Sequence, residues 1–286
     1  MIYFYLPNFY QTGFRKVNLC LIKQLREHPE AFYNDISIGA IYGNFPEVIW
    51  NGGRTMLHGD VGISEVKNIY DEFNSLGIPI RFTHTNCLIN ANHLGDFKAN
   101  FLTSMADNGM NEILVNSPCL EEYLREVFPN FKYISSTTKC LLNDTEIEKE
   151  SEKYYLTVLD YRKNMDKNYL YSLKNPERYE ILLNAYCNPL CPKREQHYLQ
   201  LSEDQLKNNN TDKPCDIRAD NFYDSLSFDS VIKAEELYEK MVPYGFKHFK
   251  IEGRTNHIVD VINSYVYYMV KPNYQNYVRS LLLKAF

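Results

Sequence analysis

The sequence lacks several features that mark large classes of protein. Lysine and arginine do not outnumber the acidic residues, with 31 against 36, which gives a formal net charge of −5 over 286 residues. We therefore expect no broadly basic surface for RNA or DNA, although net charge leaves room for a local patch. The N-terminus, Met1 to Pro7, has no basic start followed by a long apolar stretch, and no apolar run elsewhere could span a bilayer. We expect a cytoplasmic protein with no place in the membrane.

The signatures of several common enzyme classes are missing as well. The segment after the first apolar run, Pro7 to Gly13, carries no dinucleotide-binding glycine pattern. The chain has neither the HExxH motif of zinc proteases nor the nucleophile elbow of serine hydrolases. The radical-SAM motif CxxxCxxC would need a cysteine at position 194, which is Arg194.

What is present is typical of a globular protein. Hydrophobic residues make up 44% and charged residues 23%, which allows a substantial core. A length of 286 residues suits one large domain, and single α/β barrels commonly have this size. In a reducing compartment the seven cysteines should be thiols or metal ligands rather than disulfides.

Short β-branched or aromatic runs recur along the chain, separated by segments of helical length. Near-continuous apolar strands that alternate with helices indicate a parallel sheet covered on both faces. Eight such units predict one α/β domain, 1–286, a regular or irregular (β/α)8 TIM-type barrel, with a long cysteine-containing loop insertion after strand 7, at about 187–228. The expected strands are Ile2–Leu6, Ile36–Tyr42, Ile78–Thr85, Glu112–Asn116, Lys132–Thr137, Tyr154–Leu159, Tyr179–Asn184 and Phe246–Ile251.

In such a barrel the groups just past the carboxyl ends of the strands converge on one face, where enzymes of this fold place their sites. For any single asparagine, capping a helix or a turn is the competing explanation. The recurrence of amides at several strand ends favours a site. The polar residues at these positions are Asn44, Arg54, Asn86, Asn116, Thr138, Asp160, Asn184, Lys250, Glu252 and Arg254.

Two cysteines, Cys187 and Cys191, directly follow the seventh expected strand, and Cys215 lies downstream. Thiolates are soft ligands, suited to zinc or to an iron–sulfur cluster, and a cluster typically takes four of them. Cys140, at the end of the fifth strand, is our preferred fourth ligand, ahead of Cys119. Zinc bound with His197 as the fourth ligand, or thiols that bind no metal, are the alternatives.

The last expected strand ends in Lys250-Ile-Glu-Gly-Arg254. Lys250 and Glu252 share one face of a strand, and burying both charges is costly unless they are paired. We expect them to pair with each other or with Asp160 and Asn184. Arg254, beyond Gly253, can bind a carboxylate or phosphate through two parallel hydrogen bonds. A structural salt bridge that closes the barrel is the competing explanation.

These features resemble the collagenase-like peptidase U32 family. The resemblance rests on Lys250-Ile-Glu-Gly-Arg254, similar to the family's KIEGR hallmark, and on the cysteine-containing segment 184–198. It implies an α/β barrel with a [4Fe–4S] cluster and oxygen-independent hydroxylation of RNA bases or quinone precursors. By position, Cys187, Cys191 and Cys215 match the cluster cysteines. We expect no C-terminal extension of the kind that RNA-modifying relatives carry, so RNA is not the favoured partner.

We therefore expect an oxidoreductase or hydroxylase that binds an iron–sulfur cluster and acts on a small anionic substrate, with a redox protein as a potential partner. A metal-dependent peptidase is the runner-up, and a non-catalytic barrel with a structural metal is a third reading. The expected catalytic residues are Glu252, Lys250 and Asp160. The expected substrate-binding residues are Arg254, Arg54, Asn86, Asn116 and Asn184, and the expected metal ligands are Cys187, Cys191, Cys215 and Cys140.

Overall fold

The structure is a computed structural model that describes residues 1–286 except 53–56, 210–216 and 254–256. Three residues singled out from the sequence, Arg54, Cys215 and Arg254, lie outside the described residues. No helix in the described part of the chain combines the length and apolar character needed to cross a membrane.

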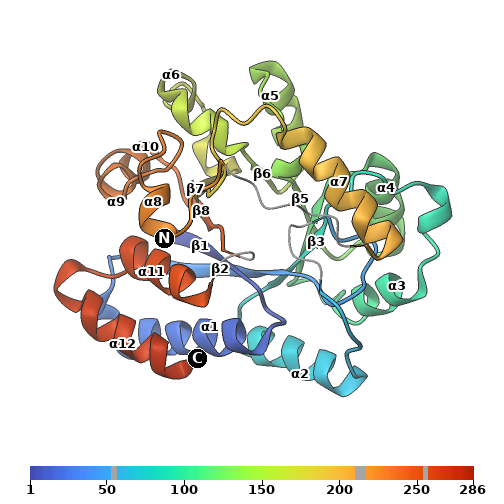
Figure 1. The fold of residues 1–286 in the computed structure, drawn as a ribbon, viewed down its shortest axis with the longest axis horizontal. Helices are drawn as coiled ribbons and strands as arrows, with labels where there is room; N and C mark the ends of the chain where they lie inside the picture. Colours follow the sequence, from blue (N-terminus) through green and yellow to red (C-terminus); the bar gives the residue numbers. More distant parts are fainter. Residues whose placement is uncertain (53–56, 210–216, 254–256) are drawn as a thin grey trace. The chain divides into compact units, whose positions relative to one another are not determined.

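Eight parallel strands close into a barrel in the order β1-β2-β3-β4-β5-β6-β7-β8, which confirms the predicted (β/α)8 fold (Figure 1). Each expected run became a strand because its residues are apolar enough to be buried on both faces, as in β7, where all six residues are buried. The strands are β1 Ile2–Pro7, β2 Ile36–Gly43, β3 Ile80–His84, β4 Glu112–Val115, β5 Lys132–Ser135, β6 Leu156–Val158, β7 Tyr179–Asn184 and β8 His248–Ile251.

Helices alternate with the strands, as the sequence predicts. They are α1 Thr12–Glu27, α2 Ile63–Asn74, α3 Phe97–Ser104, α4 Pro118–Val127, α5 Asp144–Lys153, α6 Lys167–Leu170, α7 Arg194–Lys207, α8 Phe222–Ser225, α9 Ala234–Glu236, α10 Val242–Tyr244, α11 Ile258–Met269 and α12 Gln275–Ala285. A π-helical turn, η6 Leu237–Met241, joins α9 to α10. Short 3₁₀ turns are η1 Pro29–Ala31, η2 Ala91–His93, η3 Thr137–Lys139, η4 Tyr161–Met165, η5 Pro176–Arg178 and η7 Pro272–Tyr274.

The helix ends show which sequence signals decided local structure. Ser117 caps α4 by accepting a hydrogen bond from the Leu120 amide, and Pro118 occupies the first turn, where its missing N–H costs nothing. The helix α2, by contrast, begins at Ile63 after Gly62, which offers no side-chain cap.

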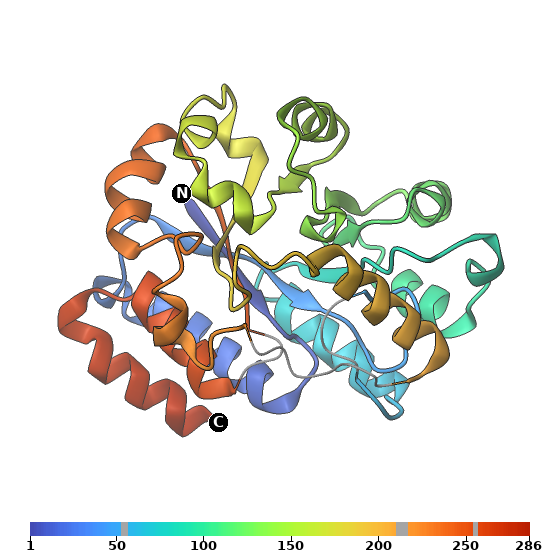
Figure 2. The same cartoon turned by 45° about the horizontal axis from the view of Figure 1, so that its top comes forward.

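The chain falls into two compact units. Unit 1 comprises residues 1–40, 159–190 and 216–286, and in it α11 and α12 pack beside α1 (Figures 1 and 2). Unit 2 comprises residues 41–158 and 191–215, and it contains β3 to β6 together with α7. The single-domain organisation over 1–286 stays a prediction.

The insertion after β7 differs from the long polar loop expected from the sequence. Its described part contains α7 and α8, so much of it is helical. The sequence pattern did not predict the helix α7, because the side chains on its buried face are mostly polar. Buried positions recur with helical spacing, but only Tyr198 and Leu201 among them are apolar.

Candidate functional site

Lys250 forms a buried ion pair across two neighbouring strands. Its Nζ lies 3.5 Å from Oε1 of Glu180 on β7, and the two side chains are 8% and 0% exposed. The register places Leu182 beside Lys250 and Glu180 beside His248, so the pair is diagonal. The expected partners of Lys250 were Glu252, Asp160 and Asn184, and Glu180 was missed. Pairing offsets the cost of burying both charges, which favours a structural role for Lys250.

Glu252 directly follows β8, and its backbone is held by the side chain of Asn184. Asn184 Nδ2 donates to the Glu252 carbonyl oxygen at 3.1 Å, and Asn184 Oδ1 accepts from the Glu252 amide at 2.9 Å. A Cβ on the next residue, Gly253, would lie 2.4 Å from Val261 Cγ2, so only glycine fits. The structure therefore brings Asn184 and Glu252 together, with the Glu252 side chain half-buried at the strand end.

Asp160 follows β6 and caps the short turn η4. Its Oδ1 accepts from the Arg162 amide at 2.9 Å and from Arg162 Nε at 2.9 Å, while Oδ2 accepts from Arg162 Nη2 at 3.1 Å. The carboxylate is fully buried. These bonds give Asp160 a capping and pairing role, because its carboxylate accepts both from the backbone and from the side chain of Arg162.

Cys187 lies two residues beyond Ala185, directly after β7. Its backbone forms an antiparallel bridge with Arg218, a residue that follows Cys215 by three positions in the sequence. The Ala219 amide donates to the Tyr186 carbonyl at 2.8 Å and extends this contact. The half-buried Cys187 side chain packs beside a small apolar cluster of Tyr161, Leu182 and Ala185.

The predicted metal centre needs further ligands. Cys191 is half-buried, and Cys215 lies outside the described residues. Among the residues that the structure describes, no three His, Cys, Asp or Glu side chains gather closely enough to hold a metal ion. Because the predicted ligand set includes Cys215, the metal centre stays a prediction.

Cys140, the expected fourth ligand, is buried beneath α7. It forms an apolar cluster with Tyr198 and Leu201, and it ends η3 in the left-handed backbone conformation, with φ of 55°. Burial of a thiol among apolar groups is the usual setting of a structural cysteine.

The ends of β3 and β5 lie under α7. Asn86, after β3, donates from Nδ2 to the carbonyl oxygens of Ile49 at 2.9 Å and Ser202 at 3.1 Å. Arg194, at the start of α7, donates to Thr137 Oγ1 at 3.4 Å. Asn86, predicted to bind substrate, therefore holds α7 and the segment before β3 in place.

Asn116 follows β4 and contacts the next strand end. Its Nδ2 donates to Thr138 Oγ1 at 2.7 Å, and the Thr138 hydroxyl donates in turn to Ser136 Oγ at 3.0 Å. The side chain is half-buried, so its remaining hydrogen-bonding capacity suits a ligand at the strand ends. Asn116 stays a predicted substrate-binding residue, and the two predicted arginines, Arg54 and Arg254, lie outside the described residues.

His84, at the end of β3, is a buried core histidine. Its ring nitrogens lie 3.2 Å from Asn44 Nδ2 and 3.0 Å from Thr103 Oγ1. Burial disfavours the charged imidazolium and lowers the pKa of His84 to about 3. The ring is therefore neutral at physiological pH.

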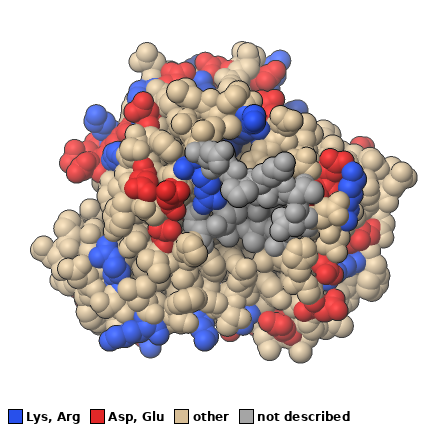
Figure 3. All heavy atoms as spheres, in the orientation of Figure 1, with Lys and Arg blue, Asp and Glu red and all other residues tan. Residues whose placement is uncertain are grey.

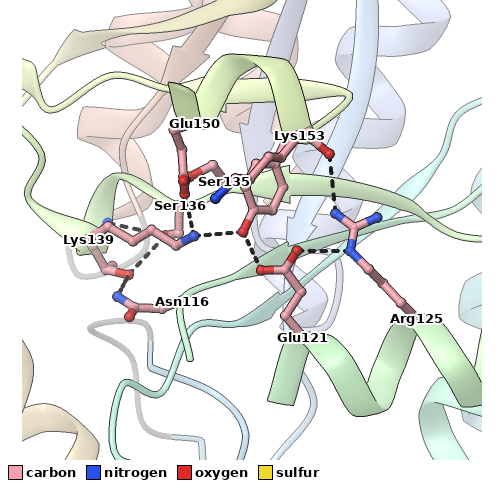
Figure 4. Close-up of polar contacts among 10 residues, drawn as sticks. Asn116, Glu121, Arg125, Ser135, Ser136, Lys139, Glu150 and Lys153 are labelled. Carbon is pink, nitrogen blue, oxygen red and sulfur yellow. Dashed lines mark hydrogen bonds and ion pairs between the residues drawn. The ribbon is translucent and has the colours of Figure 1, made fainter. Parts of the chain in front are cut away.

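Sequence reasoning missed a network of charged groups between β5, α4 and α5 (Figure 4). Lys139 donates to Glu150 and, at 2.8 Å, to the Tyr154 hydroxyl, which donates to Glu121. Arg125 Nε donates to Glu121 Oε1 at 2.8 Å. Burial, and then the hydrogen bond to Glu121, raise the pKa of Tyr154 above its ordinary range. Because positive and negative groups balance, the network fixes the segment that follows β5.

Charge on the face shown in Figure 3 has both signs. Patches of Lys and Arg alternate with patches of Asp and Glu, and the coloured residues form no continuous basic surface there. This distribution agrees with the net charge of −5. It gives no indication of a nucleic-acid surface on this face.

Comparison with known proteins adds a fold likeness. No protein-family model matches the chain, and no curated protein matches it. A solved structure, that of the U32 peptidase Mk0906, is similar with a TM-score of 0.53 and 14% identity, over 90% of this chain and 95% of that chain. Identity this low shows the fold alone. The chain thus has a U32-peptidase-like barrel.

Proposed function

We propose that this protein is an iron–sulfur barrel enzyme that carries out oxygen-independent redox or hydroxylation chemistry on a small anionic substrate. The observation that carries the proposal is the backbone bridge between Cys187 and Arg218. It supports a thiolate centre at the end of β7, because Cys187 there meets the chain segment that follows Cys215 by three residues.

The donor chemistry fits such a centre in part. Cys187 and Cys191 are separated by three residues just past a barrel strand, a spacing that lets two sulfurs face one centre, and Cys215 is the proposed third ligand. The packing of Cys140 with Tyr198 and Leu201 favours a structural thiol, so the proposal rests on the other three cysteines. When bound, a [4Fe–4S] cluster supplies one-electron transfer. Such thiols suit a reducing compartment, and we propose a cytoplasmic location.

The chain's own residues position the substrate in this proposal. The Asn184 amide holds the backbone of Glu252, so the Glu252 carboxylate is fixed at the strand end, where it can accept or return a proton. The buried pair of Lys250 and Glu180 keeps β7 and β8 in register beneath it. Asn116 offers a hydrogen-bonding amide, and we assign anion binding to Arg54 and Arg254 on the strength of their sequence positions. A redox protein would exchange electrons with the cluster and, for a hydroxylation, would accept the two electrons that the substrate loses.

The fold likeness to a protein named as a U32 peptidase favours a second candidate, a metal-dependent peptidase. It predicts peptide cleavage by the metal-loaded protein and no visible absorption from a cluster. A non-catalytic barrel would show neither. We place the peptidase behind the redox proposal because the sequence carries no HExxH motif or nucleophile elbow.

Anaerobic purification followed by iron and sulfide analysis tests the proposal. We expect the broad visible absorption of an iron–sulfur cluster in the native protein, and its loss with most of the iron in Cys187→Ser. Cys140→Ser should keep the iron and lose stability, and Cys20→Ser, on the distant helix α1, serves as the matched control. Iron content that is equal in Cys187→Ser and the native protein would refute the cluster at this position.

A further inference from the structure

The helix α7 contacts the strand ends of unit 2 near its start, in its middle and in its last turns. Near its start, Arg194 donates to Thr137 after β5. In its middle, Tyr198 and Leu201 pack against Cys140. In its last turns, Ser202 accepts from the Asn86 side chain through its carbonyl and from the Cys87 amide, at 3.2 Å, through its hydroxyl. The helix therefore covers the ends of β3 and β5 (Figures 1 and 2).

The buried face of α7 is unusual for a core helix because it is mostly polar. Only two of its buried residues are apolar, whereas most buried residues of α11 are aliphatic or aromatic. The buried polar residues of α7 are Arg194, Ser202, Asp204 and Gln205. Releasing such a face from the barrel exposes little apolar surface to water, so its cost is small compared with release of α11.

Two buried polar atoms, one on α7 and one in the residue before Asn86, lack a hydrogen-bond partner in the described part of the chain. Gln205 Oε1 on α7 and Thr85 Oγ1 just after β3 have no hydrogen-bond partner among the described residues, although their residues are only 6% and 4% exposed. A buried polar atom without a partner costs free energy that solvation recovers. The closed position of α7 is therefore held less tightly than its burial suggests.

We propose that α7 is a lid, which opens as a unit from the ends of β3 and β5 while the barrel stays folded. Opening frees the Asn86 side chain and the Cys87 amide at the end of β3 from Ser202, and so admits a small polar ligand to the strand ends of unit 2. The inference concerns α7 alone and does not depend on the iron–sulfur proposal, since the lid can open with or without a bound metal.

Two cysteines beneath α7 are natural reporters of this motion. Cys87 Sγ lies 3.2 Å from Ser202 Oγ and 3.9 Å from the Tyr198 carbonyl oxygen. Cys140 packs against Leu201. Cys20 on α1 and Cys119 on α4 lie on other helices and serve as internal references.

The test is alkylation of the full-length protein by iodoacetamide, followed by mass spectrometry of the cysteine peptides over a series of low urea concentrations. We expect Cys140 to react much faster than global unfolding allows. We also expect the rate to depend weakly on urea, because lid opening exposes far less surface than unfolding does.

A matched pair of variants shows whether the helix moves as a unit. Leu201→Ala removes a buried contact of α7, and Leu199→Ala changes a side chain on the same helix that is 49% exposed. Leu201→Ala should raise the labelling of Cys140 and of Cys87 by the same factor, about tenfold or more, and leave Cys20 and Cys119 unchanged. Leu199→Ala should change none of them.

Cys87 decides between a lid and a local defect, because its thiol contacts two other residues of α7, Ser202 and Tyr198. Faster labelling of Cys140 alone would indicate a cavity beside it and overturn the lid. Labelling of both cysteines only at the rate of global unfolding, with its full urea dependence, would overturn it as well.

Discussion

Two buried ion pairs, one in each unit, show how differently the barrel holds its charges. In unit 2, Arg81 Nε on β3 lies 2.6 Å from Glu112 Oε2 on β4, directly across the register, with side chains 0% and 4% exposed. In unit 1, Lys250 and Glu180 are 3.5 Å apart and diagonal. The planar guanidinium is suited to a short bond with a carboxylate, whereas an ammonium is a point charge that tolerates a looser position. We infer that the Arg81 pair is rigid structure and the Lys250 pair an adjustable one beside the site.

The largest effect should follow removal of Arg81. Arg81→Met leaves the Glu112 carboxylate buried without its main partner, so the free energy of unfolding should fall by about 3–5 kcal/mol. Urea denaturation measures this. Adding Glu112→Leu to the same variant should restore much of the loss, because an apolar pair replaces a lone charge. A loss of less than about 1 kcal/mol in the single variant would contradict the rigid role.

Lys250→Met should lower the free energy of unfolding by about 3 kcal/mol, which is less than the effect of Arg81→Met. The reason is that the ion pair it breaks is longer and diagonal. The same urea experiment compares the two. Glu252→Gln is the matched control at the site: it should leave stability nearly unchanged and reduce ligand binding or activity. If Lys250→Met lowers the free energy of unfolding more than Arg81→Met does, the Lys250 pair is the more rigid one, and the inferred contrast between the two pairs is wrong.

His84 gives unit 2 a pH dependence. Its pKa is lowered to about 3 in the folded protein from 6.5, so the unfolded chain binds the proton more tightly. The stability contributed by the neutral ring is complete above pH 6.5 and is lost as the pH falls toward the folded pKa. At pH 5 the loss should be about 2 kcal/mol. The free energies of unfolding of the native protein and of His84→Gln, measured at several pH values, test this prediction. If both change with pH in the same way, the pH dependence does not come from a buried neutral His84.

The smallest effect should come from Asn184→Ala. The variant loses two hydrogen bonds to the Glu252 backbone, and we expect a loss of about 1–2 kcal/mol together with weaker ligand binding. Calorimetry of the variant measures both losses. Unchanged binding in Asn184→Ala would show that Glu252 needs no positioning.

The strands were predictable because a strand that is buried on both faces has a nearly continuous run of apolar residues, as in β7. The partner of Lys250 was not found, because it depends on the register between β7 and β8. A signal existed, since Glu180 is the single acidic residue within the apolar run YEILLN. A carboxylate in a strand buried on both faces needs a cationic partner on a neighbouring strand.

The network around Lys139 could not be predicted for a different reason. Glu121, Arg125 and Glu150 lie on α4 and α5 and look like ordinary charges on exposed helix faces. Only the fold brings them to Lys139 and Tyr154. The same holds for α7, whose polar buried face resembles a loop in sequence and becomes recognisable only through its contacts with the ends of β3 and β5.

The central claim, a thiolate-bound iron–sulfur centre at the end of β7, is tested most directly by anomalous diffraction at the iron absorption edge from crystals grown without oxygen. The account predicts iron peaks bonded to the sulfur atoms of Cys187, Cys191 and Cys215. A map from reconstituted protein with no iron peak, and with the Cys187 thiol packed against Tyr161 and Leu182, would contradict it.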